Sequence, residues 1–192
     1  MKRVFISISA ATAMLLSGCA SDPVNLHYYL LHSPSKVVEK EQRAATAHIR
    51  FNRIALPDYL KQRGLAMQTG PATVFFSSSH VWAEPLASGL VQSLSESLWQ
   101  EQHIDVIPNG VYEHLTVHDV AIHVDDLIAT NNNEVVLRGH FWLYPAAAEP
   151  VMQRFDYRRE LTADGFEHAV INMRELVTLL AADVAKSVSD VK

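Results

Sequence analysis

The chain has 192 residues, of which 16 are Lys or Arg and 21 are Asp or Glu, giving a formal net charge of −5. A hydrophobic fraction of 48% is ordinary for a globular domain and too high for a disordered one. A net negative surface repels the phosphate backbone of nucleic acids, so we expect no nucleic-acid partner.

The chain begins with the features of an export signal. Met1 to Arg3 form a basic start, Val4 to Leu16 is mostly apolar, and two small residues precede Cys19, the single cysteine. The apolar run is shorter than the roughly 20 residues that a membrane-spanning helix needs, and its length is typical of a cleaved signal peptide. We therefore predict that residues 1–18 are removed.

The residues around the cysteine, Leu16-Ser17-Gly18-Cys19, resemble the lipobox of bacterial lipoproteins. In proteins with that motif the cysteine sulfur receives a diacylglyceryl group and the new amino terminus is acylated. The resemblance implies a lipid anchor at Cys19; the alternative is an ordinary buried cysteine in an N-terminal strand. Several acyl chains hold a protein firmly on a membrane. Ala20, and not an aspartate, follows the cysteine, which by the sorting rule of such lipoproteins implies the periplasmic leaflet of the outer membrane.

Removal of the signal would leave 174 of the 192 residues, the usual size of one domain. The basic count would fall from 16 to 14 against 21 acidic residues, a net charge of −7. No second cysteine is present for a disulfide within the chain, so stability must come from the core. We expect a lipidated tether over residues 19–26 and a single domain over residues 27–192.

Four segments in the first half are rich in β-forming residues and bounded by turns, and each predicts a strand: 27–31, 47–56, 65–68 and 72–77. The last two flank the turn at Gly70-Pro71 and are expected to pair as a hairpin. The charged run at residues 36–43 predicts a solvated loop. Residues 57–60 begin a turn or short helical stretch that Gly64 ends.

From Val81 to Gln102 the apolar pattern changes to a helical period. The residues that recur at every fourth position are Trp82, Leu86, Leu90, Leu94 and Leu98. They predict one apolar face of a long helix. Ser79 is the expected N-cap, and Pro85 is tolerated only near the first turn.

The second half predicts four strands, at residues 104–107, 115–128, 134–144 and 152–161, and a helix at 166–188. The two longest strands are joined by the turn at residues 130–133 and are expected to form a hairpin. Together the elements predict an α/β fold: a single domain with a mixed, largely antiparallel sheet and two long amphipathic helices packed on one face.

The strand at residues 134–144 has two different faces. Its apolar side chains, Val135, Leu137, Phe141 and Leu143, share one face with Gly139, and the other face carries Arg138, His140, Trp142 and Tyr144. Because Trp, Tyr and Arg are concentrated at protein interfaces, these last four residues are a candidate partner interface. Cross-strand pairing within the sheet is the alternative.

Ten histidines suggest a metal site, and the densest group contains His114, His118 and His123. Along a regular strand His118 and His123 point to opposite faces, so they cannot bind one ion together without a bulge. The sequence also lacks a glycine-rich phosphate loop and paired cysteines. We therefore predict no metal site and no cofactor.

The segment Ser77-Ser78-Ser79-His80 is the one candidate for nucleophilic catalysis. Adjacent residues rarely face each other, and no G-x-S-x-G elbow is present. A polar turn that caps the next helix explains the same residues. We therefore expect no catalytic residue; a periplasmic serine hydrolase using Ser78 or Ser79 with His80 is a rival hypothesis.

Three motifs in this order, Tyr28-Tyr29-Leu30-Leu31, Ile54 to Leu60 and Trp82 to Leu86, are similar to those of the auxiliary lipoproteins of ABC-type transport systems. The resemblance covers essentially the whole mature chain. It implies a non-enzymatic outer-membrane lipoprotein that forms a homo-oligomeric ring and docks onto a periplasmic tunnel protein with MCE domains, through which lipids move. A lipoprotein that binds a lipid or another ligand on its own is the second rival, and it would need a sizeable apolar cavity.

Overall fold

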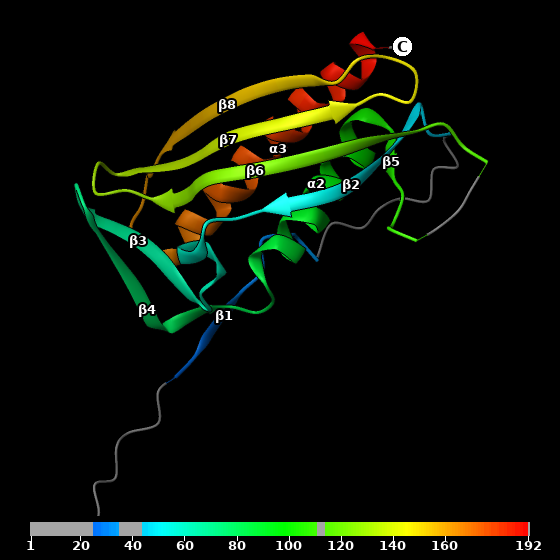
Figure 1. The fold of residues 1–192 in the computed structure, drawn as a ribbon. Coiled ribbons are helices and arrows are strands. Elements are labelled where there is room, and N and C mark those ends of the chain that lie inside the picture. The colour runs from blue at the N-terminus through cyan, green and yellow to red at the C-terminus, as the bar shows by residue number, and fades with distance from the viewer. Residues whose placement is uncertain (1–24, 35–43, 111–113, 192) are drawn as a thin grey trace, which may run out of the picture.

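A computed structural model describes residues 25–34, 44–110 and 114–191 of the protein. The predicted signal peptide, Cys19 and the charged run at residues 36–43 lie outside these ranges. The described residues form one domain in which a broad, twisted sheet lies over two long helices (Figure 1).

The sheet contains eight strands among the described residues. In chain order they are β1 (His27–Tyr29), β2 (Ala47–Ala55), β3 (Gly64–Gly70), β4 (Thr73–Trp82), β5 (Ile104–Val106), β6 (Val117–Ala129), β7 (Glu134–Tyr144) and β8 (Val151–Glu160). The helices are α2 (Leu86–Gln102) and α3 (Phe166–Asp190), and a short 3₁₀ helix, η1, spans Asp58–Lys61.

The longest pairings in the sheet are antiparallel. The chain forms hairpins β3–β4 and β6–β7, and β8 continues from β7. Parallel pairs complete the sheet: β6 lies beside β2 over several residues and beside β3 at Met67, while β2 also pairs with β5 and β4 with β1. The predicted α/β class with a mixed, largely antiparallel sheet is confirmed.

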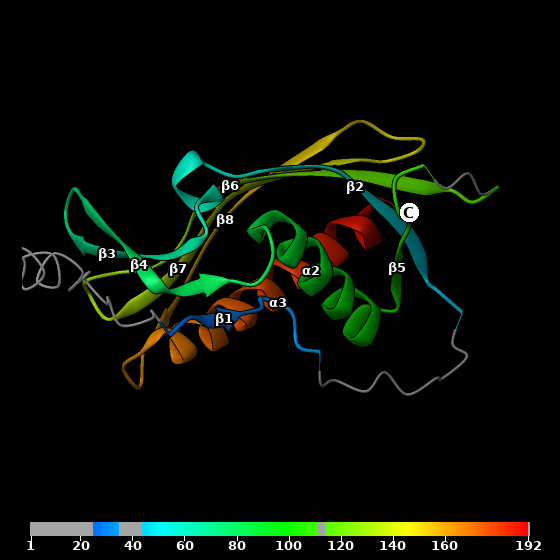
Figure 2. The same ribbon diagram turned by 90° about the horizontal axis from the view of Figure 1, so that it is seen from below.

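Both helices cover the same face of the sheet (Figure 2). The apolar stripe of α3 is buried against β6, β7 and β8, and that of α2 is buried against β2, β5 and α3. Burial of this area is the main source of the domain's stability. In the part of the chain that the structure describes, no helix combines the length and the apolar character needed to cross a membrane.

The predicted start of the first helix is wrong. Strand β4 continues to Trp82, and α2 begins only at Leu86, after Pro85. Ser79 therefore lies in a strand and does not cap the helix. Trp82 is the last residue of β4 and is buried. Its apolar side chain therefore continues the four-residue repeat of α2 back into the strand. The buried face from Leu86 to Leu98 is confirmed.

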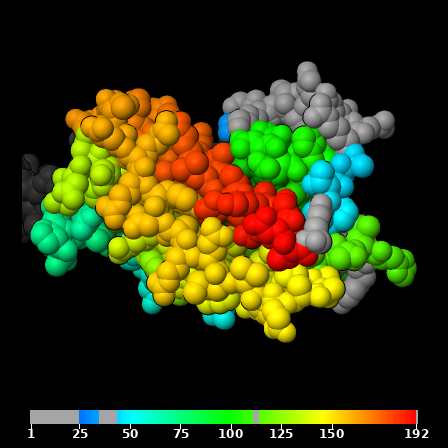
Figure 3. Space-filling model, turned by 90° about the horizontal axis from the view of Figure 1, so that it is seen from above, coloured from blue at the N-terminus to red at the C-terminus, as the bar shows by residue number. Residues whose placement is uncertain are grey.

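Helix α3 is fastened to β8 by polar contacts as well as by apolar packing, and the two elements lie side by side on the surface seen in Figure 3. The Tyr157 hydroxyl donates a hydrogen bond to the Asp183 carboxylate. Burial, together with this hydrogen bond, raises the pKa of Tyr157 well above its usual value. Arg159 of β8 forms an ion pair with Glu175, which lies about two turns before Asp183 on α3.

We expect Tyr157→Phe to lower the free energy of unfolding by about 1–3 kcal/mol at pH 8, because Asp183 loses its donor in a half-buried site. The raised pKa means that the unfolded chain releases the phenolic proton near pH 10 while the folded protein retains it. The stabilisation is therefore present below pH 10 and is lost as the pH rises further. The difference in free energy of unfolding between parent and variant, measured with urea, should be smaller at pH 11 than at pH 8. An equal difference at the two pH values would contradict this account. Tyr144→Phe, at an exposed tyrosine, is the control.

Candidate partner-binding surface

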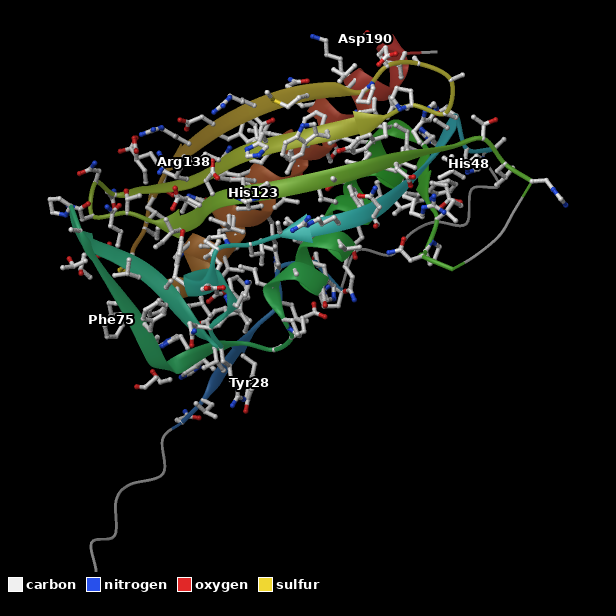
Figure 4. The ribbon with its side chains drawn as sticks, in the orientation of Figure 1. Tyr28, His48, Phe75, His123, Arg138 and Asp190 are labelled. Carbon is white, nitrogen blue, oxygen red and sulfur yellow. The ribbon has the colours of Figure 1, made fainter. Side chains whose placement is uncertain are left out.

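The face of the sheet opposite the helices is the candidate functional surface. On β7 the predicted alternation is confirmed: Val135, Leu137, Phe141 and Leu143 are fully buried. The other four residues, Arg138, His140, Trp142 and Tyr144, point away from the helices and are partly or largely exposed; we call them the open face of β7. Figure 4 shows Arg138 and His123 on this side of the sheet.

Arg138 is held by a neighbouring carboxylate. Its guanidinium forms an ion pair with Asp126 on β6, and the Tyr59 hydroxyl donates to the same carboxylate at 2.8 Å. Burial and the hydrogen bond to Asp126 raise the pKa of Tyr59. The loop that follows β2 is thus fixed against β6, and Arg138 is presented in a defined position.

The centre of the open face is aromatic. His140 stacks on His123 of β6 with ring centroids 4.9 Å apart, and its ring meets that of Trp142 edge-on at 4.4 Å. Met152 of β8 lies beside Trp142 in the sheet register and is 49% exposed. Tyr144 extends this apolar surface and is 40% exposed. Large side chains that are pre-ordered by their neighbours lose little entropy when a partner covers them.

The cross-strand alternative for these residues is also realised. Arg138 pairs with Asp126 and His140 with His123, so two of the four side chains stabilise the sheet itself. Farther along, Arg50 of β2 binds Asp119 of β6 with two hydrogen bonds of 2.8 and 3.1 Å. The surface therefore combines an exposed apolar centre with charges that are already paired. Such a surface suits a protein partner, and this role stays a prediction.

The histidines do not gather into a metal centre in the described residues, where no three His, Cys, Asp or Glu side chains are suitably placed. His118 and His123 lie at positions of opposite orientation on β6, as the sequence predicts. The His118 ring accepts a hydrogen bond from the backbone of Ala146 at 3.4 Å, and His123 lies 3.5 Å from Asp125.

The segment Ser77 to His80 is part of β4 and does not form the predicted polar turn. The register against β3 shifts here, so the extra β4 residues form a bulge. Ser77 accepts hydrogen bonds from the backbone of Ser79 and His80, at 3.3 and 2.9 Å, which explains its buried hydroxyl.

The His80 ring is held in a stack of aromatic side chains. Its centroid lies 4.9 Å from that of His27 and 4.5 Å from that of Phe166. The hydroxyls of Ser77 and Ser79 both lie within 3.3 Å of its Nδ1 atom. Ser78 is exposed. Packing and bulge geometry account for these contacts without a catalytic role.

Two surface grooves are relevant to the rival hypothesis that the protein binds a lipid or another ligand on its own. One, of about 420 Å³, lies between the β3–β4 hairpin and the neighbouring ends of β6 and β7. The other, of about 440 Å³, lies between β1 and α3. Polar and charged residues line much of both grooves, including Asp126 and Arg138 in the first and Glu167 and Arg174 in the second. Neither groove is the apolar cavity that the rival hypothesis requires.

One surface feature was not predicted from the sequence. Val74, Phe75 and Phe76 on β4 are consecutive and all substantially exposed. The sequence predicted this segment as a strand, and a strand with three neighbouring apolar residues ordinarily indicates burial on both faces. The absence of charged residues from the hairpin also ordinarily indicates burial, so no local signal in the sequence revealed the exposure.

Comparison with known proteins agrees with the fold and with the sequence resemblance. The chain is 21% identical to the intermembrane transport lipoprotein PqiC of Escherichia coli K12 and to that of Shigella flexneri, over 98% of each chain. A crystal structure of an uncharacterized protein superposes with a TM-score of 0.71 at 19% identity, covering 85% of this chain and 99% of that one. A Xanthomonas campestris protein gives a TM-score of 0.60 at 10% identity, covering 84% and 91%. Residues 29–185 match the family model of the ABC-type transport auxiliary lipoprotein component, and the chain therefore belongs to that family.

Proposed function

We propose that the protein is the outer-membrane-anchored lipoprotein of an intermembrane lipid transport system, in which it docks onto a periplasmic tunnel protein with MCE domains. The observation that carries the proposal is the similarity to intermembrane transport lipoproteins over 98% of the chain. The family match over residues 29–185 covers the folded domain.

The proposed anchor is the lipidated Cys19, followed by a tether over residues 19–26 that leads into β1 at His27. Ala20 follows the cysteine, which supports sorting to the periplasmic leaflet of the outer membrane. Acyl chains bury many methylenes, each contributing about 0.8 kcal/mol, so the domain stays at the membrane without a spanning helix.

The proposed docking surface is the open face of β7 together with Met152. Its exposed aromatic and sulfur-containing side chains supply the apolar contact area that protein interfaces require. Its arginine is already paired with Asp126, so a partner need not desolvate an unpaired charge at that position. Membrane integrity would depend on this contact because the tunnel needs a fixed end at the outer membrane.

We further propose that several copies form a ring around the end of the tunnel. Among the described strands β8 pairs only with β7, so it forms an edge of the sheet where a second copy has room to pack. Its outward residues include Arg154, Asp156 and Arg158, charges that favour specific contacts between copies over indiscriminate strand pairing.

The proposal is tested by photo-cross-linking in outer membranes. A photo-reactive amino acid at Tyr144 is expected to give a cross-linked product containing an MCE-domain protein, and the same residue at Leu179 is the control. Leu179 is 47% exposed but lies on α3, on the other side of the domain. Mass spectrometry of the products identifies the partner, and products that join two copies of this chain support the ring.

Two results would count against this function. Recovery of the MCE-domain protein equally from Tyr144 and Leu179 would contradict the proposed surface while leaving the partner in place. Recovery of no MCE-domain protein from either position, with the chain present in the outer membrane, would contradict the docking itself.

A further inference from the structure

The β3–β4 hairpin carries an apolar strip that the core does not use. Val74, Phe75 and Phe76 are 42, 51 and 40% exposed, and we call these three residues the β4 edge. Because neighbouring residues of a strand point to opposite faces, the hairpin is apolar on both sides here. A protein surface that docked on one side of the hairpin would leave the other side in water.

The whole hairpin is uncharged. From Gly64 to Trp82 the sequence contains no Asp, Glu, Lys or Arg, and the run is bounded by Arg63 and Glu84. In a chain of which 19% is charged, a surface segment of this length would ordinarily carry several charges. Their absence removes the largest cost of placing a surface segment against lipid, where ionised side chains are expensive.

The first described strand pairs with the same strand as this strip. Strand β1 runs parallel to β4, with His27 opposite His80 and Tyr29 opposite Trp82, so β1 begins at the end of this pairing that is nearer in sequence to Phe76. Arg174 of α3 fixes the entry point by donating to the backbone carbonyls of Leu30 and Leu31 at 2.9 and 3.1 Å. Figure 4 shows Phe75 and Tyr28 toward the same end of the molecule, with Asp190 at the opposite end.

The length of the tether brings the lipid anchor within reach of the β4 edge. Cys19 precedes His27 by eight residues, and an extended chain spans at most about 3.3–3.6 Å per residue. The anchor therefore lies within about 30 Å of the start of β1. The membrane that holds the acyl chains is therefore the nearest apolar surface for the three exposed side chains.

We propose that the β4 edge rests in the boundary between the headgroups and acyl chains of the membrane that carries the anchor. The inference rests on the lipid anchor of the proposed function. Lipid surrounds an inserted strand on both faces, which matches a strip that is apolar on both faces. The depth is limited because, among the described strands, β4 gains a neighbour on its outer side only where β1 pairs with residues 80–82. The remaining backbone groups on that side need water or headgroups as partners, so the strand stays at the interface.

A second point of contact would fix the orientation of the domain. A flexible tether alone lets the domain rotate on the membrane, whereas contact at both the tether and the β4 edge holds the same side of the domain toward the bilayer. The open face of β7 would then take a constant angle to the membrane. A constant angle lowers the entropic cost of docking a tunnel that arrives from the periplasm.

The test uses the full mature lipoprotein in vesicles of phosphatidylethanolamine and phosphatidylglycerol. Because acylation occupies Cys19, a new cysteine at the exposed Ser78, two residues from Phe76, is labelled selectively with an environment-sensitive fluorophore. Vesicles with nitroxide-bearing lipids report contact by quenching. We expect strong quenching at Ser78→Cys and little at Asp190→Cys, the exposed control at the far end.

The double variant Phe75→Ser, Phe76→Ser is expected to reduce the quenching at position 78 to the level of the Asp190 control, while the protein still sediments with the vesicles. Leu179→Ser, which removes an equally exposed apolar residue from α3, should leave the quenching unchanged. Sedimentation with no more quenching at position 78 than at 190 overturns the inference and leaves the anchor intact. Cross-links between copies at position 78 in place of quenching also overturn it, because the strip would then be covered by a second copy. Failure to sediment overturns the anchor and, with it, this inference.

Discussion

Cys19→Ser is expected to abolish attachment to the outer membrane. Serine cannot accept the thioether-linked diacylglyceryl group that the lipobox resemblance implies, and in proteins with this motif cleavage follows that modification. The variant should therefore retain residues 1–18 and be missing from the outer-membrane fraction. Intact-mass spectrometry of the purified parent and variant, with separation of inner and outer membranes, measures both effects.

Ser21→Ala is a suitable control because it changes the tether without touching the cysteine. It should leave the mass of the acyl groups and the outer-membrane location unchanged. The proposal fails if the parent protein carries a free thiol and an intact leader, or if the Cys19→Ser variant has the processed mass and the location of the parent.

Gly139→Ala is expected to produce the largest loss of stability from a single added methyl group. A Cβ atom at position 139 would lie 2.1 Å from the backbone carbonyl oxygen of His123 and 2.9 Å from the ring of Phe155. The first contact is with the backbone of the adjacent strand β6, so no rotamer change relieves it. Overpacking in a well-packed core typically costs about 1–3 kcal/mol, and a clash with paired backbone belongs at or above the upper end.

Urea unfolding measures this effect as a lower transition midpoint with an unchanged dependence on urea concentration. Gly70→Ala is the matched control in the β3–β4 hairpin. There an added Cβ atom would meet only the end of the Thr73 side chain, at 2.8 Å, and that side chain can rotate away. Equal destabilisation by the two substitutions would contradict the role assigned to the close approach of β6 and β7.

The prediction and the structure agree best where the information is local. Alternation along β7 and the helical repeats of α2 and α3 depend only on which residues are apolar and how they are spaced. The sequence therefore sufficed to identify the buried and outward faces of β7, including the four residues proposed to bind a partner. Their neighbours Asp126, His123 and Met152 come from other strands and depend on the register.

The errors occur where two local patterns overlap. Trp82 fits the four-residue repeat of α2, but Pro85 prevents the helix from extending back through the preceding turn, and β1 pairs with the end of β4. Ser77 to Ser79 have the composition of a turn, yet Phe76 and Val81 on either side of them pair with β3 and the His80 ring is held in an aromatic stack, so the serines lie in a bulged strand. Both outcomes depend on segments distant in the sequence.

The sequence by itself determined the elements, the faces of the long strand and helices, and the family motifs, because periodicity and residue type act over a few positions. Only the tertiary structure decided that β2 and β3 share one side of β6 and that Phe75 and Phe76 remain exposed. Burial is a property of the assembled layers: an apolar strand is covered only if another element reaches it, and at the β4 edge none of the described elements does.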